Sequence, residues 1–580
     1  MDRKRKKKVI GLLIEELESE FSKDLIQSIV SAIPSSRDIQ LVVFAGKYIN
    51  NSSYDKTRTY KTVYNSVYKL GGMCGIDGII MHFGSMGDEQ IRGMIMQYAD
   101  NYINVPKVFI ALNSSAHTTV NYDNERGIRE AVNCLVNVNG LTRFCMLGGR
   151  DDNIDARARK DIFIRCLKEN DISFSRWNYE KTDMSENCIT EAARLLDNNI
   201  GVQAIFCVND SVARGLYEAM KARDLVPGKD VYVFGFDNTH MAGEMTPTLS
   251  SIGADKCSLG KMALEVMLAK LNGTDIGSAL VPTRLYGRQS FYYEMYDYTA
   301  VDLQNADEAF IYRLFDDCFY RYRNETMDRE SVNLKRLFYE FMSRMFKAMK
   351  KRYTSYEDYS ETAVLIEKFF EKGAMEYTDA AKLITSIDRV QFSMNNCQRS
   401  PASRIMTNRL FALMRDKAMC ALAEKKSMER ESILEKRSMT QDFMIAGMTA
   451  KGTKSEKEEQ IFRNITKLGI RNAAVYMYDS PVQYSFHKVE GFPENIKLRC
   501  VVRSGEMYLI PKERQFCRIN DIFVRDELSS RCKGYAPFII FYDDKIYGII
   551  LCELTSDIYD RGEYIALQLG RTIYIINQNN

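Results

Sequence analysis

The chain has 580 residues, of which 45% are hydrophobic and 27% are charged, and its formal net charge is +3. This length exceeds what one hydrophobic core serves, so it predicts a globular protein of about three or four domains. A net charge so near zero excludes a general electrostatic attraction to nucleic acid or acidic membranes.

Several classes of protein are disfavoured by simple patterns. No apolar run is long enough for a membrane span, and the apolar stretch 9–14 runs into two glutamates without a cleavage site, so we expect no secretory signal. The 14 cysteines include no C-x-x-C pair and the four histidines lie far apart. We therefore expect a cytoplasmic protein with reduced thiols, no metal and no cofactor.

The chain begins with a basic tail, residues 1–7, which we expect to be solvated; contact with nucleic acid or a membrane surface is the alternative. From residue 8 to about residue 292, apolar runs typical of strands alternate with helical segments. This alternation predicts an α/β fold with doubly wound parallel sheets.

Two of these strands end in polar side chains. The apolar runs 204–208 and 231–236 are too short for helices and have the β-branched and aromatic residues of buried parallel strands. Asn209 and Asp210 follow the first run, and Asp237 follows the second. Because ligands of open α/β sheets bind beyond the carboxyl ends of the strands, the sequence predicts a binding cleft there.

The same region resembles the effector-binding domain of the LacI/GalR family, which has a type I periplasmic-binding-protein fold. The shared pattern consists of Asn-Asp, Leu-Val-Pro, Asp-Val, Val-x-Gly-Phe-Asp and Pro-x-Leu, at 209–210, 225–227, 230–231, 233–237 and 247–249. Earlier segments that resemble strands of the family extend the likeness to residues 8–292, namely 8–14, 75–80, 105–110 and 144–149.

The resemblance implies two lobes with a hinge between them. Lobe one is expected to hold residues 8–112 and 240–275, and lobe two residues 113–239 and 276–292. A ligand held by both lobes would favour their closed arrangement.

The resemblance also implies the residues that bind the ligand. Arg159 takes the place of the family's ligand-binding arginine, and Phe21 that of an aromatic residue lining the crevice. The donors of Arg159, the acceptor of Asp237 and the amide of Asn209 suit a sugar or a comparable polar ring. Turn formation or helix capping is the structural alternative for Asn209 and Asp237. Two further candidates are Asn113 and Asp183.

One position departs from the family pattern. Ala111 stands where many sugar-responsive members have an aspartate, which argues against a plain monosaccharide; Asn113 could replace part of the missing hydrogen bonding. Asp210 is expected to cap the helix that follows it, and Trp177 to pack in the strand before Asp183.

Residues 302–442 are predicted to be all-helical. Glycine is nearly absent, and apolar residues recur at steps of three and four. The charged segment 416–442 could pair as a two-helix linker, although its heptads are irregular.

Residues 455–578 are predicted to form a C-terminal α+β domain. We expect a helix at 458–468, a strand at 473–478, a hairpin at 537–554 and a closing helix at 561–576. This order of elements resembles a GAF-like sensory domain.

We expect no enzyme, because the sequence contains no phosphate-binding loop, no nucleophile elbow and no recognisable Cys–His pairing. The sequence predicts a sensor of a small polar effector, which passes lobe closure through helices to the GAF-like domain or to an output protein in trans. The resemblance implies a homodimer. The family's helix-turn-helix is not expected, since the first strand begins at residue 8.

Two other functions are considered. The chain could be a transcription regulator that contacts DNA through a non-standard surface within 302–442, which includes the basic stretch 347–352. A secreted solute-binding protein is disfavoured by the additional domains.

Overall fold

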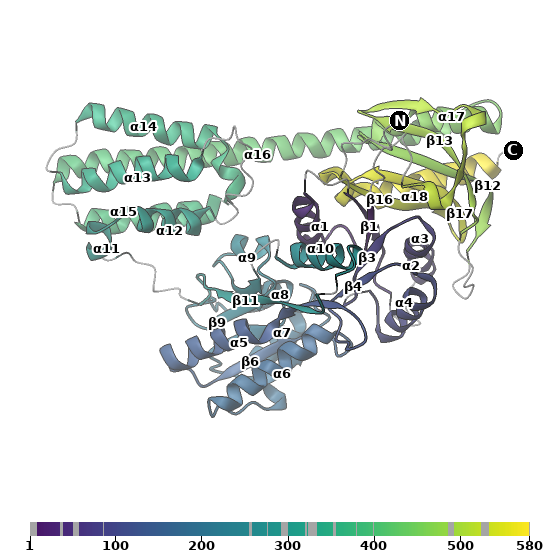
Figure 1. Cartoon of the computed structure of the whole chain (residues 1–580). Helices are drawn as coiled ribbons and strands as arrows, with labels where there is room; N and C mark the ends of the chain where they lie inside the picture. The colour runs from purple at the N-terminus through teal and green to yellow at the C-terminus, as the bar shows by residue number, and fades with distance from the viewer. Residues whose placement is uncertain are drawn as a thin grey trace.

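The fold is that of a computed structural model. The structure describes residues 8–34, 39–49, 57–84, 86–254, 258–274, 276–291, 298, 300–319, 322, 333–351, 355–378, 380–397, 400–484, 492–523 and 533–578. The basic tail at 1–7 lies outside the described residues. A two-lobed α/β region, a group of helices and a C-terminal sheet domain make up the molecule (Figure 1).

Lobe one contains a parallel sheet in the order β2-β1-β3-β4-β5. Its strands are β1 (Lys8–Ile14), β2 (Ile39–Ala45), β3 (Gly78–His82), β4 (Lys107–Ile110) and β5 (Thr119–Asp123). β2 and β3 are buried throughout, as expected for strands covered on both faces. Its helices are α1 (Glu20–Ala32), α2 (Arg58–Tyr64), α3 (Val67–Met73), α4 (Glu89–Tyr102) and α10 (Ser258–Leu271).

Lobe two contains a second parallel sheet, in the order β7-β6-β8-β9-β10. Its strands are β6 (Phe144–Gly148), β7 (Tyr179–Lys181), β8 (Ala204–Cys207), β9 (Tyr232–Phe236) and β10 (Ser250–Ala254). Its helices are α5 (Asn124–Asn133), α6 (Ile154–Glu169), α7 (Ile189–Asn198), α8 (Asp210–Lys221) and α9 (His240–Glu244). The parallel α/β fold expected from the alternating pattern is therefore present.

The chain crosses between the lobes at other places than expected. β5 pairs with β4 and so belongs to the sheet of lobe one, whereas β10 pairs with β9 and belongs to lobe two. β11 (Ala279–Tyr286) pairs with both β5 and β10 and joins the two sheets. The boundaries expected at residues 113 and 240 are wrong, because β5 pairs within the sheet of lobe one and β10 within that of lobe two. β11, which was expected in lobe two, pairs with a strand of each lobe.

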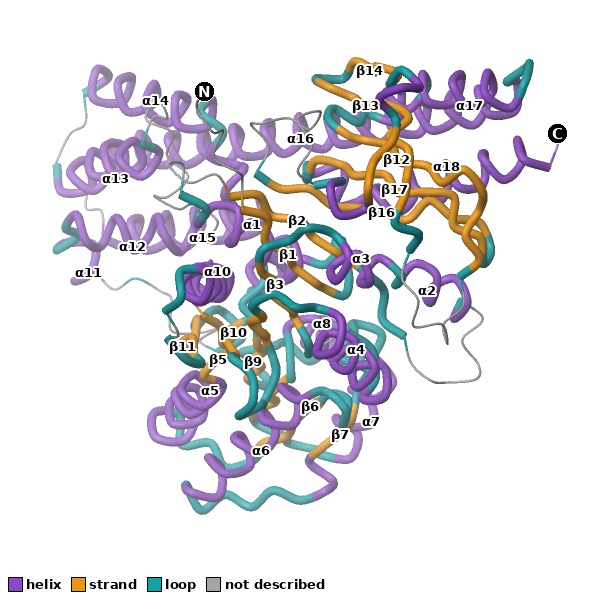
Figure 2. The backbone as a smooth tube through the Cα atoms, turned by 45° about the vertical axis from the view of Figure 1, so that its right-hand side comes forward, coloured by secondary structure: helices purple, strands orange, loops and turns teal. Residues whose placement is uncertain are grey.

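The helical region carries its own core. It consists of α11 (Ala300–Gln304), α12 (Glu308–Cys318), α13 (Leu334–Lys350), α14 (Tyr356–Glu371), α15 (Ala380–Cys397) and α16 (Pro401–Thr449). Buried phenylalanine and methionine side chains fill the space between these helices. Ser400 caps α16, and Pro401 occupies its first turn, where no amide hydrogen is needed. This helix runs from the bundle to the C-terminal domain (Figure 2).

The C-terminal domain contains an antiparallel sheet with β13-β12-β17-β16 at its centre. Its strands are β12 (Ala473–Gln483), β13 (Asn495–Arg503), β14 (Glu506–Leu509), β15 (Phe516–Arg518), β16 (Gly534–Tyr542) and β17 (Lys545–Glu553). α17 (Lys454–Arg463) precedes the sheet, and α18 (Ser556–Gln578) follows it. The expected hairpin and closing helix are confirmed, although α18 begins five residues earlier in sequence, at Ser556 rather than Arg561.

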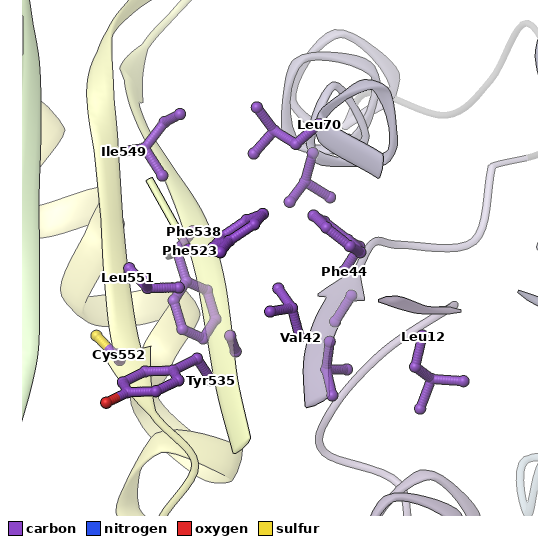
Figure 3. Packing of buried hydrophobic residues seen from close by; sticks show 14 of the residues in the cluster. Leu12, Val42, Phe44, Leu70, Phe523, Tyr535, Phe538, Ile549, Leu551 and Cys552 are labelled. Atoms are coloured by element: carbon purple, nitrogen blue, oxygen red, sulfur yellow. The ribbon is translucent and has the colours of Figure 1, made fainter. Parts of the chain in front are cut away.

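The C-terminal domain is packed directly onto lobe one. β16 pairs in parallel with β2 through Gly534–Leu41 and Tyr535–Val42, so the two sheets are continuous. Their buried side chains form one cluster (Figure 3), in which the rings of Phe44 and Phe523 lie 5.8 Å apart. Lobe one and the C-terminal domain therefore share a core. Among the described residues, no helix has the length and hydrophobicity needed to cross a bilayer.

Candidate ligand-binding cleft

Arg159 is held at the carboxyl ends of the lobe-two strands. It projects from α6, and only 4% of its side chain is exposed. Its Nη1 donates to the carbonyl oxygen of Val208 at 2.8 Å, its Nε donates to Asn124 Oδ1 at 3.3 Å, and its Nη2 lies 3.1 Å from Asp237 Oδ1. The guanidinium also lies over the ring of Phe236, 3.6 Å from the centroid. These contacts fix the orientation of the guanidinium.

Asp237 occupies an unusual turn after β9. Its φ is 96°, in the left-handed region that few residues other than glycine adopt. The turn is held by a hydrogen bond from the Asp237 amide to the carbonyl oxygen of Ile252, at 2.7 Å. Burial raises the pKa of Asp237, and the charge of Arg159 opposes that change. The turn thus directs a partly exposed carboxylate toward Arg159.

A second carboxylate continues this polar cluster toward lobe one. Asn124 Nδ2 donates to Asp155 Oδ1 at 3.2 Å. Across the cleft, the rings of Phe21 and His82 lie 4.8 Å apart. Burial lowers the pKa of His82 to about 4, although the charge of Asp155 acts in the opposite direction. His82 is therefore neutral near pH 7, and Asp155 is close enough to lobe one to act on it electrostatically.

The two lobes touch each other in this structure. Arg92 of α4 is buried and donates to the carbonyl oxygen of Asp152 in lobe two. Its Nη1 lies 3.6 Å from the Asp152 carboxylate. Asn153 Nδ2 donates to the carbonyl oxygen of Gly84 at 3.2 Å. These contacts hold the lobes close together beside the Arg159 site.

Asn209 lies near Arg159 in the fold, but its amide is bonded within lobe two. Its Oδ1 accepts from the amide of Val212 at 2.9 Å, so Asn209 is the N-cap of α8. Its Nδ2 donates to the carbonyl oxygen of Met184 at 3.0 Å. The capping interpretation of Asn209 is confirmed, and a ligand that bound this side chain would have to exchange one of these bonds.

Asp210 was expected to cap α8, and this expectation is wrong. Asn209 takes that position, so Asp210 is the first residue of the helix and points into the protein. Its carboxylate accepts from Thr239 N at 2.8 Å, from Thr239 Oγ1 at 2.9 Å and from Ser251 Oγ at 2.5 Å. Burial first, and then the charge of Asp237, raise the pKa of Asp210 to about 7.

The remaining predicted residues lie on exposed loops. Asp183 accepts from Ser185 N at 2.9 Å and from Ser185 Oγ at 2.7 Å, and Asn113 is exposed after β4. Trp177 does not pack in a strand: it is 61% exposed on a short turn, with the Arg176 guanidinium 4.6 Å from its ring centroid. The Ser175 cap of that turn directs the indole outward.

Three residues of the cleft were not singled out by the sequence. Asn124 and Asp155 contact each other beside Arg159, and Arg92 joins the lobes. Each lies within the first few residues of a helix, so the only available signal is a polar side chain at a helix start, which ordinarily indicates capping.

Comparison with known proteins agrees with this fold. Residues 133–291 match the model of a periplasmic binding protein-like domain. The chain is 25% identical over 268 residues to the HTH-type transcriptional repressor PurR of Vibrio vulnificus (strain CMCP6), a match that covers 46% of this chain and 75% of that protein. It is 32% identical over 134 residues to the ribose operon repressor of Escherichia coli (strain K12), covering 23% of this chain and 40% of the repressor.

Solved structures that match part of this chain include a complex of the transcriptional regulator CelR with cellobiose, at 19% identity and a TM-score of 0.42, over 49% of this chain and 85% of that chain. A dimeric lac repressor with an 11-residue C-terminal deletion matches at 22% identity and a TM-score of 0.42, over 49% of this chain and 98% of the repressor. Residues 133–291 are thus similar to periplasmic binding protein-like domains, and proteins similar to this chain include the transcriptional repressor PurR.

Proposed function

We propose that this protein senses a small polar molecule, of the sugar or sugar-derivative class, between its two lobes and thereby regulates transcription or a partner protein. The observation that supports this proposal most directly is the buried guanidinium of Arg159 beside the carboxylate of Asp237, at the carboxyl ends of the lobe-two strands. Relatives of this chain include the repressor of a ribose operon. No catalytic step is proposed.

The chemistry of the cleft supports a hydroxyl-rich ligand. Asp237 and Asp155 would accept hydrogen bonds from neighbouring hydroxyls, and Arg159 would donate to one of them. Phe21 would cover an apolar face of the ring from lobe one. Asn209, Asn113 and Asp183 are proposed as outer contacts, since none of them bonds to the Arg159 cluster.

Transmission from the cleft is proposed to pass through an ion-pair cluster on lobe one. Glu18 lies in the loop before α1, the helix that carries Phe21. Lys47 Nζ lies 3.0 Å from Glu18 and 2.6 Å from Glu563 of α18. Tyr60 also donates to Glu563. A shift of the start of α1 at Phe21, and of the loop before it, would therefore act on the closing helix of the C-terminal domain.

The helical region follows lobe two in the chain and reaches the C-terminal domain through α16. It follows Phe291, which is buried in the core of lobe two. It ends in α16, whose Phe443 is buried in the core that lobe one shares with the C-terminal domain. Arg561 of α18 donates to Thr440 Oγ1 of α16 at 3.2 Å. We propose that rotation of lobe two against lobe one changes the strain on this bundle, and that the GAF-like domain or an output protein in trans responds.

Direct binding of DNA through the basic stretch 347–352 is less well supported. Lys350 Nζ donates to the carbonyl oxygen of Gln304 at 2.5 Å, and Lys351 Nζ lies 3.0 Å from Asp358. Both cations are thus bonded within the bundle. A homodimer stays a prediction, which static light scattering of the full chain would test.

A thermal-shift screen tests the proposed function. Pentoses, hexoses and disaccharides, including ribose and cellobiose, are added to the full chain, because a ligand that binds only the folded state raises the unfolding midpoint. We expect at least one sugar to raise it in the wild type and in Arg165→Ala, an exposed arginine of the same helix α6. The shift should be absent in Arg159→Ala. A shift of equal size in Arg159→Ala would refute the proposed site.

A further inference from the structure

A cavity lies in lobe one, away from Arg159 and Asp237. It has a volume of about 240 Å³ and lies between the helices α2–α3 and α4, with Tyr484 of the C-terminal domain on its wall. These helices lie on the side of lobe one next to the C-terminal sheet (Figure 1). The cavity is lined by none of the residues around Arg159. It is therefore separate from the proposed effector site.

The walls of this cavity suit a flat aromatic molecule. Its base is apolar, with Leu13 of β1, Met81 of β3 and Ile95 of α4. Four tyrosines surround this base. The hydroxyls of two of them are already used, since Tyr68 donates to the carbonyl oxygen of Ile14 at 2.9 Å and Tyr98 to that of Lys69 at 2.9 Å. The rings of Tyr68 and Tyr98 are thus presented as apolar walls, and Tyr102 and Tyr484 also line the cavity.

The size and charge of the cavity narrow the ligand class. An apolar cavity of about 150 Å³ is enough for benzene, so 240 Å³ suits a molecule of one or two rings. Among the residues that the structure describes, Lys69 is the one charged residue that lines it. Its Nζ lies 4.9 Å from the ring centroid of Tyr484, and burial lowers its pKa. An anionic group near Lys69 would offset the cost of burying this ammonium group.

We propose that this cavity binds a small planar aromatic acid, with its ring between the tyrosines and its carboxylate at Lys69. Gln97 and Asn101 also line the cavity, and their amides would provide further hydrogen bonds for polar ring substituents.

The cavity adjoins groups that reach lobe two. Asn65 accepts from the amide of Lys47 at 2.7 Å and donates to the carbonyl oxygen of Lys47 at 2.8 Å. The next residue, Tyr48, lies under the guanidinium of Arg150 in lobe two, 4.3 Å from ring centroid to Cζ. α4, the opposite wall, carries Arg92, which binds Asp152. A ligand in the cavity would restrict the motion of both walls and so favour the closed arrangement of the lobes. This second step rests on the proposed function.

Calorimetric titration of the full chain with 4-hydroxybenzoate and indole-3-acetate tests the site. We expect binding in the wild type, at least a tenfold weaker affinity in Lys69→Met, and no binding in Met94→Trp, which fills the cavity. Lys61→Met on α2 is the matched control and should bind as the wild type does. Arg159→Ala should also bind, because the acid does not occupy the cleft.

Three results would overturn the site: no binding of either acid at millimolar concentration, unchanged affinity in Lys69→Met, or loss of binding in Arg159→Ala. Lys69→Met preserves the aliphatic stem and keeps the test valid if Met94→Trp fails to fold. Small-angle scattering tests the coupling: the acid should reduce the radius of gyration of the wild type. An unchanged radius with retained binding would refute the coupling and leave the site in place.

Discussion

Lys47 of lobe one and Glu563 of the C-terminal helix α18 lie 2.6 Å apart, although one belongs to the first α/β unit of the chain and the other to its last helix. Burial acts to lower the pKa of Lys47, but its hydrogen bonds with Glu563 and Glu18 raise it overall. The ammonium group is thus kept charged at the place where the domains meet. Lobe one and the C-terminal domain are joined by charge as well as by their shared core.

Glu563→Gln is expected to destabilise the chain by about 1 kcal/mol, since the pair with Lys47 is partly buried. Urea unfolding measures the change. Asp560→Asn is the matched control on the same helix, because its pair with Lys23 is more exposed. An equal or larger loss in Asp560→Asn would contradict a special role for Glu563.

Phe44→Ala should lower the stability of lobe one and of the C-terminal domain together. Phe44 is fully buried, and its ring contacts Phe523 of the other domain, so truncation is expected to cost about 3–5 kcal/mol. Scanning calorimetry should show one transition for both units moving to lower temperature. Phe163→Ala, in the separate core of lobe two, should leave that transition in place. Separate transitions for the two joined units would refute a shared core.

Asp210 makes the stability depend on pH. Its pKa rises from 3.8 to about 7 on folding, so the native state binds more protons than the unfolded state between these values. Stability should therefore fall as the pH rises from about 4 to about 7, by at most about 4 kcal/mol. Asp210→Asn mimics the protonated acid and should flatten this slope. Urea midpoints at several pH values measure it, with Asp197→Asn on an exposed site as control. Identical slopes in both variants would show that Asp210 is not responsible.

Arg92→Met should open the lobes. Arg92 is buried on α4 and bonds to Asp152 of lobe two, and methionine keeps the apolar stem without the charge. We expect a larger radius of gyration in small-angle scattering. Arg129→Met serves as control, since Arg129 pairs with Glu125 and Glu169 within lobe two. If the radius stays the same, the Arg92 contact does not hold the lobes together.

Much of the fold could be predicted because local patterns agree with the final structure. Buried strands such as β8 and β9 appear as short apolar runs, and the β16–β17 hairpin appears as two apolar runs around Asp543 and Asp544. The Arg159–Asp237 contact followed from family resemblance, since nothing in the local sequence places a residue of α6 beside the end of β9.

The domain contacts could not be predicted. β2 and β16 are each apolar enough to be central strands, but no local sequence pattern predicts that they pair with each other. The lobe boundaries were also misplaced. β5 and β10 follow the same strand–helix order as their neighbours in sequence, and only their hydrogen-bonded pairing shows to which lobe each belongs. Asn209 took the capping role expected of Asp210, since adjacent polar residues at a helix start compete for one cap.

Titration calorimetry with the sugar found by the screen is the most direct test of the proposed effector site. Asp237→Asn should weaken binding about 100-fold, because a charged acceptor beside Arg159 is lost. Asp197→Asn, an exposed aspartate of lobe two, should bind as the wild type does. Affinity within twofold of the wild type in Asp237→Asn would contradict recognition of the effector by Arg159 and Asp237.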